Sequence, residues 1–135
     1  MADTFELEIA TPEKLVIREQ VTEAQIPAAN GMIGVLPEHA PLISELGIGE
    51  LTYQLGGAKK SLVVSNGWVE VFKNHVRVLA DRAEQASDID VARAQASLKR
   101  AEDRLSKAAA DGVDIARALN AMKRAQARIA AAGVR

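Results

Sequence analysis

The sequence of 135 residues contains no cysteine, and only 3% of its residues are aromatic. The absence of cysteine excludes disulfides, thiolate metal sites and cysteine nucleophiles. No stretch approaches the roughly 20 consecutive apolar residues that a membrane-spanning helix needs. The first residues, MADTFELEIATPEK, lack the basic start and apolar centre of a secretory signal peptide. The sequence therefore predicts a soluble, cytoplasmic protein without direct membrane insertion, which can still lie against a membrane inside a larger complex.

The composition changes after Ala86. Residues 1–86 carry 7 basic and 12 acidic residues, whereas residues 87–135 carry 10 basic and 6 acidic residues. All four prolines and all the aromatic residues lie in the first segment, and fifteen alanines lie in the second. We therefore expect two architectures, residues 1–86 and residues 87–135, joined in one chain.

The first segment has the pattern of short β-strands. Apolar residues alternate with polar ones, as in FELEI at its start, and alternation is the period of a half-buried strand. Gly56-Gly57, Asn66-Gly67 and Lys73-Asn74-His75 are turn signals, each of which we expect to separate two strands. Many short strands with regular turns predict an antiparallel β-sandwich or barrel.

This first segment offers no catalytic constellation. His39 and His75 are the only histidines, and neither has a serine or an acidic partner at a recognisable spacing. The segment PEHAPL is compatible with a metal or catalytic loop, but a single histidine between prolines is more often a surface or packing residue. No nucleophile, base and orienting group can be assembled, and no phosphate loop is present. We expect a scaffold and binding surface here, and not an enzyme.

The second segment predicts a helical hairpin. Ser87, three residues before Asp90, resembles a capping box, so we expect the first helix to begin there. Apolar residues then recur with a period of 3.5 and resume after a break at Asp111-Gly112, which predicts two antiparallel helices that pack along a seam. The predicted seam positions are Val91, Ala94, Leu98, Ala101, Leu105 and Ala108, then Ile115, Ala118, Met122, Ala125, Ile129 and Ala132.

Half of these seam positions are alanine. Alanine buries little apolar area, since a CH₂-sized group contributes only about 0.8 kcal/mol. A hairpin held by so little area can open or move away when a ligand favours another state.

The segments DVARA at 90–94 and DIARA at 114–118 nearly repeat each other. Either this pattern starts a helix, or it places arginines together. At 100° per residue, six arginines follow one face of the hairpin: Arg93, Arg100, Arg104, Arg117, Arg124 and Arg128. Guanidinium groups bind phosphate and carboxylate in pairs, so this arginine face predicts an anion site, in which Asp90 orients an arginine or accepts from a polar ligand group.

Two alternatives to the anion site remain open at this stage. The arginine face is equally compatible with a solvated surface on alanine-rich helices. Binding to nucleic acid is the other alternative, but the face has no aromatic residue for base stacking and the chain is not basic.

The whole chain resembles the epsilon subunits of bacterial F-type ATP synthases. Three segments carry the resemblance: FELEIATPEKLV at the start, NGMIGVLPEHAPLI from Asn30, and IDVARA at 89–94. The resemblance implies an α+β fold, with an N-terminal antiparallel β-sandwich followed by a C-terminal antiparallel two-helix hairpin.

The resemblance also implies a role as a non-catalytic rotor subunit of the proton-translocating synthase, at the cytoplasmic face of the bacterial plasma membrane. Residues 1–86 would bind the gamma subunit and the c-ring, with Asn30, Gly31 and Met32 facing the c-ring and His39 in the gamma contact. The hairpin would alternate between a form folded on the sandwich and a form extended along gamma. The extended form would block ATP hydrolysis by the alpha/beta catalytic head.

Finally, the resemblance implies that ATP is a regulatory ligand that stabilises the folded hairpin and is held without being hydrolysed. No metal held by the protein is implied. The ATP-binding residues carried over are Glu84, Ile89, Asp90, Arg93, Ala94, Arg100, Arg124 and Arg128. The alternative function is a free-standing cytoplasmic nucleotide-sensing module that uses the same arginine face.

Overall fold

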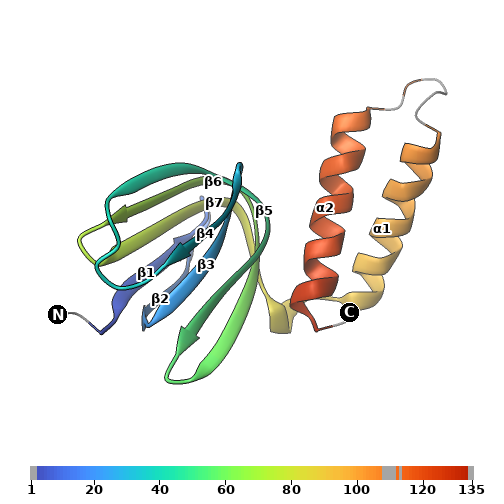
Figure 1. Cartoon of the computed structure of the whole chain (residues 1–135). Helices are drawn as coiled ribbons and strands as arrows, with labels where there is room; N and C mark the ends of the chain where they lie inside the picture. The colour runs from blue at the N-terminus through green and yellow to red at the C-terminus, as the bar shows by residue number, and fades with distance from the viewer. Residues whose placement is uncertain (1–2, 108–111, 113, 134–135) are drawn as a thin grey trace.

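The computed structural model describes residues 3–107, 112 and 114–133. Within them, a β-sandwich precedes two helices that stand beside it (Figure 1). The strands are β1 (Phe5–Ala10), β2 (Leu15–Val21), β3 (Glu23–Ala28), β4 (Gly31–Val35), β5 (Leu42–Leu55), β6 (Ala58–Phe72) and β7 (His75–Gln85). The helices are η1 (Ala86–Asp88), a short 3₁₀ turn, and the α-helices α1 (Val91–Ser106) and α2 (Ile115–Ala131). The predicted fold class is therefore confirmed.

The seven strands form one sheet that curls over its own core, in the order β2-β1-β7-β6-β5-β3-β4 (Figure 1). The alternation expected for β1 is confirmed, because Phe5, Leu7 and Ile9 are fully buried in the core. One pairing differs from the expected antiparallel arrangement: β1 and β7 are parallel. Two neighbouring parallel strands need a long connection between them, and here strands β2 to β6 form that connection.

The turn signals had different outcomes. Gly56-Gly57 is a two-residue hairpin with φ values of 57° and 85°, as primed turns require. Lys73-Asn74 is a second such hairpin, and His75 already belongs to β7. The strand break predicted at Asn66-Gly67 is wrong. The two residues lie inside β6 with positive φ values of 55° and 127°, and the pairing with β5 and β7 continues past them in the same register. A Cβ at residue 67 would overlap the carbonyl oxygen of Leu79, so this position requires glycine.

The repeated sequence starts both helices. The carboxylate of Asp90 accepts a hydrogen bond of 3.1 Å from the backbone N–H of Arg93, and that of Asp114 accepts one of 3.1 Å from the backbone N–H of Arg117. These are N-cap bonds. The start predicted at Ser87 is wrong, because that residue lies in η1 and the α-helix begins only after Asp90.

The two helices are antiparallel and meet along alanines. Within α1 and α2 as described, the buried residues are Ala94, Ala101, Ala118 and Ala125, all of them predicted seam positions. The larger seam residues are only half-buried, and Ile115 is 47% exposed. Ala108 lies outside the described residues. The contact between the helices is therefore close but small in apolar area.

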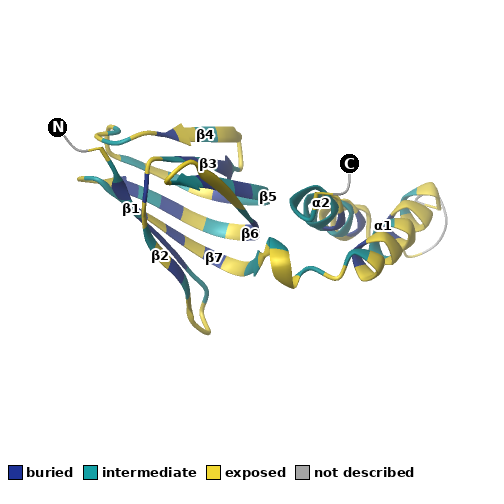
Figure 2. Ribbon diagram, turned by 90° about the horizontal axis from the view of Figure 1, so that it is seen from below, coloured by how far each residue is buried: buried dark blue, intermediate teal, exposed yellow. Residues whose placement is uncertain are grey.

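The hairpin touches the sandwich through α2, which packs against β5 and β6. Figure 2 shows α2 between the sandwich and α1. Neither of the described helices is long and apolar enough to cross a membrane.

Candidate functional site

An ion pair connects the last turn of α2 to the end of β7. The Nε of Arg128 donates to the Oε1 of Glu84 over 2.6 Å, and the two side chains are 25% and 36% exposed. Charge-assisted hydrogen bonds of this length are among the stronger polar contacts in proteins. The pair therefore attaches the C-terminal end of α2 to the sandwich.

A cavity of about 160 Å³ lies at this junction. It is lined by Glu84, Asp88, Ile89, Asp90, Arg93, Ala94 and Arg128. Six of the eight residues predicted to bind ATP thus meet around one space, from the end of β7, the start of α1 and the last turn of α2. Its lining combines carboxylates that can accept hydrogen bonds from amino and hydroxyl groups with guanidinium groups that can hold anions.

The other two predicted residues, Arg100 and Arg124, do not line the cavity. Arg100 lies two turns after Arg93 and donates to the Oγ of Ser97 over 2.9 Å on its own helix. Arg124 lies one turn before Arg128 and is half-buried. Burial lowers the pKa of Arg124, and the positive charges of Arg82, Arg128 and Arg117 lower it further.

Asp90 caps α1, and its alternative predicted role, accepting from a polar ligand group, stays a prediction. Its carboxylate accepts the backbone N–H of Arg93 and not a guanidinium group. It therefore orients Arg93 indirectly, by starting the helix, and it also lines the cavity.

The arginine face is visible at both ends of the hairpin. Arg93 and Arg128 line the cavity at the junction with the sandwich. Arg104 and Arg117 line a second cavity of about 250 Å³ at the other end, beside Asp114. Each cavity brings together one arginine from each helix, as expected for antiparallel helices with their arginines on a shared face.

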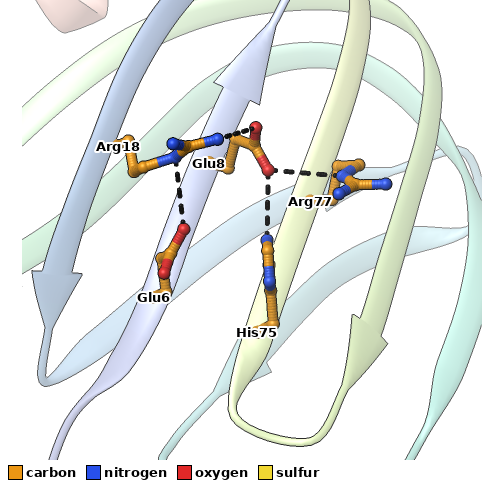
Figure 3. A network of polar contacts seen from close by, with 5 residues as sticks. All are labelled: Glu6, Glu8, Arg18, His75 and Arg77. Carbon is orange, nitrogen blue, oxygen red and sulfur yellow. Dashed lines mark hydrogen bonds and ion pairs between the residues drawn. The ribbon is translucent and has the colours of Figure 1, made fainter.

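The structure also contains a polar cluster that sequence reasoning missed (Figure 3). The buried carboxylate of Glu8 accepts from Arg18 over 3.0 Å and from Arg77 over 3.3 Å, and it contacts the Nε2 of His75 at 3.1 Å. Arg18 also contacts Glu6 at 3.3 Å. The acidic partner of His75 comes from the parallel strand β1, 67 positions away, so no sequence spacing marks it.

The hydrogen bond from Arg18 lowers the pKa of Glu8, burial opposes this effect, and bonds from His75 and Arg77 lower the pKa further. Glu6, Glu8 and His75 are close enough to share a metal ion. However, two guanidinium groups already occupy the Glu8 carboxylate and would repel a divalent cation. The cluster is therefore a structural ion-pair network.

The predicted interface residues lie in two separate places. Asn30 ends the turn between β3 and β4, and Gly31 and Met32 are the first residues of β4, where Met32 is 57% exposed. His39 lies in the loop before β5, and its Nδ1–H donates to the carbonyl oxygen of Ala40 over 2.7 Å. The neighbouring Glu38 donates its backbone N–H to Asn74 in the turn between β6 and β7.

Two family models cover nearly the whole chain. Residues 4–86 match the beta-sandwich domain of the ATP synthase Delta/Epsilon chain, and residues 87–133 match its long alpha-helix domain. The chain is 59% identical to the ATP synthase epsilon chain of Solibacter usitatus over 102 residues, which is 76% of each chain. It is 52% identical to that of Koribacter versatilis over 111 residues, 82% of this chain and 78% of the other.

Among solved structures, the fold is similar to a chain of the Euglena gracilis mitochondrial ATP synthase, in a structure that includes OSCP, F1 and the c-ring. The TM-score is 0.85 at 22% identity, over 98% of this chain and 83% of the other. At this identity the structural similarity shows only a shared fold, and membership of the family rests on the sequence matches. The chain therefore belongs to the epsilon-chain family of ATP synthases.

Proposed function

We propose that the chain is a non-catalytic central-stalk subunit of a proton-translocating ATP synthase, and that its hairpin restrains ATP hydrolysis when it leaves the sandwich. In this proposal the sandwich binds the gamma subunit and the c-ring, at the cytoplasmic face of the bacterial plasma membrane. ATP binds at the junction between sandwich and hairpin and favours the folded state. The observation that carries the proposal is the cavity at that junction, around which six predicted ATP-binding residues meet.

The attachment of the hairpin supports a reversible movement. Between α2 and the sandwich lies a cavity of about 600 Å³, whose lining includes the polar residues Glu45, Asn66, Asn120, Lys123 and Gln126. A partly polar, incompletely filled contact loses less when water replaces it than a packed apolar one does. A ligand that binds only the folded state would therefore shift the equilibrium by its own binding free energy.

The outer face of the sandwich supports a protein partner. Trp68 of β6 lies opposite Leu79 of β7, and Phe72 lies on the same face of β6 because side chains alternate. These residues are 52%, 43% and 58% exposed, and Ile43 of β5 is 72% exposed. Glu70 lies between Trp68 and Phe72 on this face and opposite Ile43, so the exposed apolar residues surround a polar position. Exposed apolar residues grouped on one face of a stable domain support an interaction surface. We assign this surface to the gamma subunit.

The proposal can be tested by reconstituting alpha, beta and gamma subunits with the full chain and measuring ATP hydrolysis. We expect inhibition to be stronger for Glu84→Gln than for the unmodified chain, because loss of the ion pair frees the hairpin. The exposed Glu102→Gln serves as a control of the same chemistry on α1. Equal hydrolysis with and without the chain, when it co-purifies with gamma, would contradict the inhibitory role.

A further inference from the structure

Arg82 is a basic residue of the sandwich that the predicted ATP site did not include. It lies two residues before Glu84 in β7, so the two side chains leave the strand on the same face. Arg124 likewise lies four residues before Arg128 in α2, on the same side of that helix. Two residues of strand span roughly 6.6 Å and one turn of helix roughly 5.4 Å. Two residues back along β7 from Glu84 is Arg82, and one turn back along α2 from Arg128 is Arg124. Because these two lengths are similar, Arg82 and Arg124 are expected to lie opposite each other.

Both positions are positively charged. Arg82 contributes the largest of the neighbouring charges that lower the pKa of Arg124, ahead of Arg128 and Arg117. Among the described residues, none of Arg82, Arg117 and Arg124 has a carboxylate within ion-pair distance, and Glu84 is already bonded to Arg128. A half-buried cation without a counter-ion is costly. In the described part of the chain, these three arginines therefore have no carboxylate that balances their charge.

We propose that Arg82 and Arg124 together bind an oligophosphate, such as the phosphate chain of a nucleoside triphosphate. This inference rests on the proposed nucleotide-binding function and adds a residue of the sandwich to it. Guanidinium groups match phosphate oxygens in a bidentate manner. Two of them from different elements form a clamp that a single phosphate chain can bridge.

The size and charge of the adjacent cavity indicate which part of a nucleotide it takes. Its volume of about 160 Å³ is smaller than the roughly 300–1,000 Å³ of typical ligand pockets. A nucleotide placed there must therefore extend beyond it. Glu84, Asp88 and Asp90 line the cavity together with Arg93 and Arg128, so it offers acceptors to nucleoside amino and hydroxyl groups and guanidinium groups to the first phosphate. Arg124, one turn along α2, is where an extending phosphate chain would arrive.

The arrangement makes docking of the hairpin depend on an anion. Without one, Arg82 of the sandwich repels Arg124 of α2. With an oligophosphate bound, the same two residues attract a common partner and hold the hairpin closed. Arg82 therefore links phosphate binding to the position of α2.

Calorimetric titration of the full chain with ATP, AMP and inorganic tripolyphosphate tests this inference. For Arg82→Gln we expect the affinities for ATP and tripolyphosphate to fall about tenfold or more, as for loss of one charge-assisted contact, with AMP binding unchanged. Lys14→Gln, which removes one exposed positive charge from the turn before β2, should leave all three unchanged. Unaltered ATP and tripolyphosphate binding by Arg82→Gln would overturn the inference.

The probes separate this inference from the proposed function. If the unmodified chain binds ATP and Arg82→Gln binds it equally well, only the role of Arg82 fails. If tripolyphosphate binds through Arg82 but ATP does not bind, the anion clamp stands and the nucleotide function fails. If the unmodified chain binds neither, both fail.

A thermal unfolding measurement distinguishes binding from a structural role. In buffer without phosphate or other polyvalent anions, Arg82→Gln should unfold at the same or a higher temperature than the unmodified chain, because it removes a repulsion. Tripolyphosphate should raise the unfolding temperature of the unmodified chain more than that of the variant. A lower unfolding temperature for the variant in the anion-free buffer would show that Arg82 is a structural residue and contradict the clamp.

Discussion

Arg128 and Glu84 form the one side-chain ion pair that joins the hairpin to the sandwich in the described part of the chain, with Nε and Oε1 at 2.6 Å. The pair lies at the edge of the candidate nucleotide cavity. The same two residues therefore belong both to the attachment of the hairpin and to the candidate ligand site.

Glu84→Gln should loosen the hairpin without unfolding the sandwich. Because both side chains are partly exposed, we expect the docked state to lose only about 0.5–1 kcal/mol. The exchange rate of the backbone amides should then rise in α2, which packs against β5 and β6, and should stay unchanged in the core strand β1. Equal exchange in α2 for Glu84→Gln and for the control Glu102→Gln would show that the pair does not hold the hairpin.

The two helix caps can be separated from ligand binding. Asp90→Ala and Asp114→Ala should each reduce hairpin stability by about 1 kcal/mol, since each removes an N-cap bond, whereas the Asn variants should retain most of the stability. Helix content and thermal unfolding followed by circular dichroism measure this effect. With the cap kept, Asp90→Asn should still weaken ATP binding if the carboxylate contacts the ligand, and Asp114→Asn should not. Identical ATP affinities for both Asn variants would restrict Asp90 to helix capping.

The Glu8 cluster predicts a pH dependence of stability. The pKa of Glu8 is lowered from its ordinary value of 4.5 by the bond from Arg18, against burial, and by those from His75 and Arg77. A carboxyl group with a lowered folded-state pKa stabilises the fold above its unfolded pKa, and this stability is lost as the pH falls through the folded pKa. The stabilisation is therefore complete near pH 7 and decreases below about pH 4.5.

Glu8→Gln should accordingly be less stable than the unmodified chain at pH 7, by about 2 kcal/mol, because a buried carboxylate is removed from half-exposed cations. The difference should shrink towards acidic pH. Urea unfolding at a series of pH values from neutral to acidic measures it. A difference that does not change with pH would mean that the charge of Glu8 is not what stabilises the sandwich.

Trp68→Ala should weaken binding to the gamma subunit and leave the fold intact, since Trp68 is 52% exposed. A tryptophan at the centre of an interface contributes about 2 kcal/mol or more, or roughly thirtyfold in affinity. Surface-plasmon measurements with purified gamma can compare it with Lys59→Ala, an exposed residue of the same strand. Unchanged affinity of the Trp68 variant would place the gamma contact on another face.

Local patterns predicted the parts of this structure that depend on neighbouring residues. The alternation at Phe5, Leu7 and Ile9 identified a buried strand face, and the 3.5-residue period identified the alanines that the hairpin buries. The helix starts were predicted less well, because Ser87 and Asp90 both have capping side chains and only the structure shows which one is used.

Features that depend on distant residues were not predictable. Glu8 and His75 are 67 positions apart and meet through a parallel pairing for which the alternating pattern carries no signal. Asn66-Gly67 has the composition of a turn, yet the pairing on both sides keeps the two residues inside β6. Six of the predicted ATP-binding residues were brought together as expected from family resemblance. Arg82 was missed because its position beside Arg124 depends on how the hairpin docks.

Calorimetric titration of the full chain with ATP, alongside Arg93→Ala and the control Lys14→Gln, tests the central claim most directly. The claim is that the junction between sandwich and hairpin is a regulatory nucleotide site. It predicts saturable binding of one ATP per chain, retained in the control and lost or weakened in the Arg93 variant. No ATP binding to the unmodified chain, or equal binding to the Arg93 variant, would contradict it.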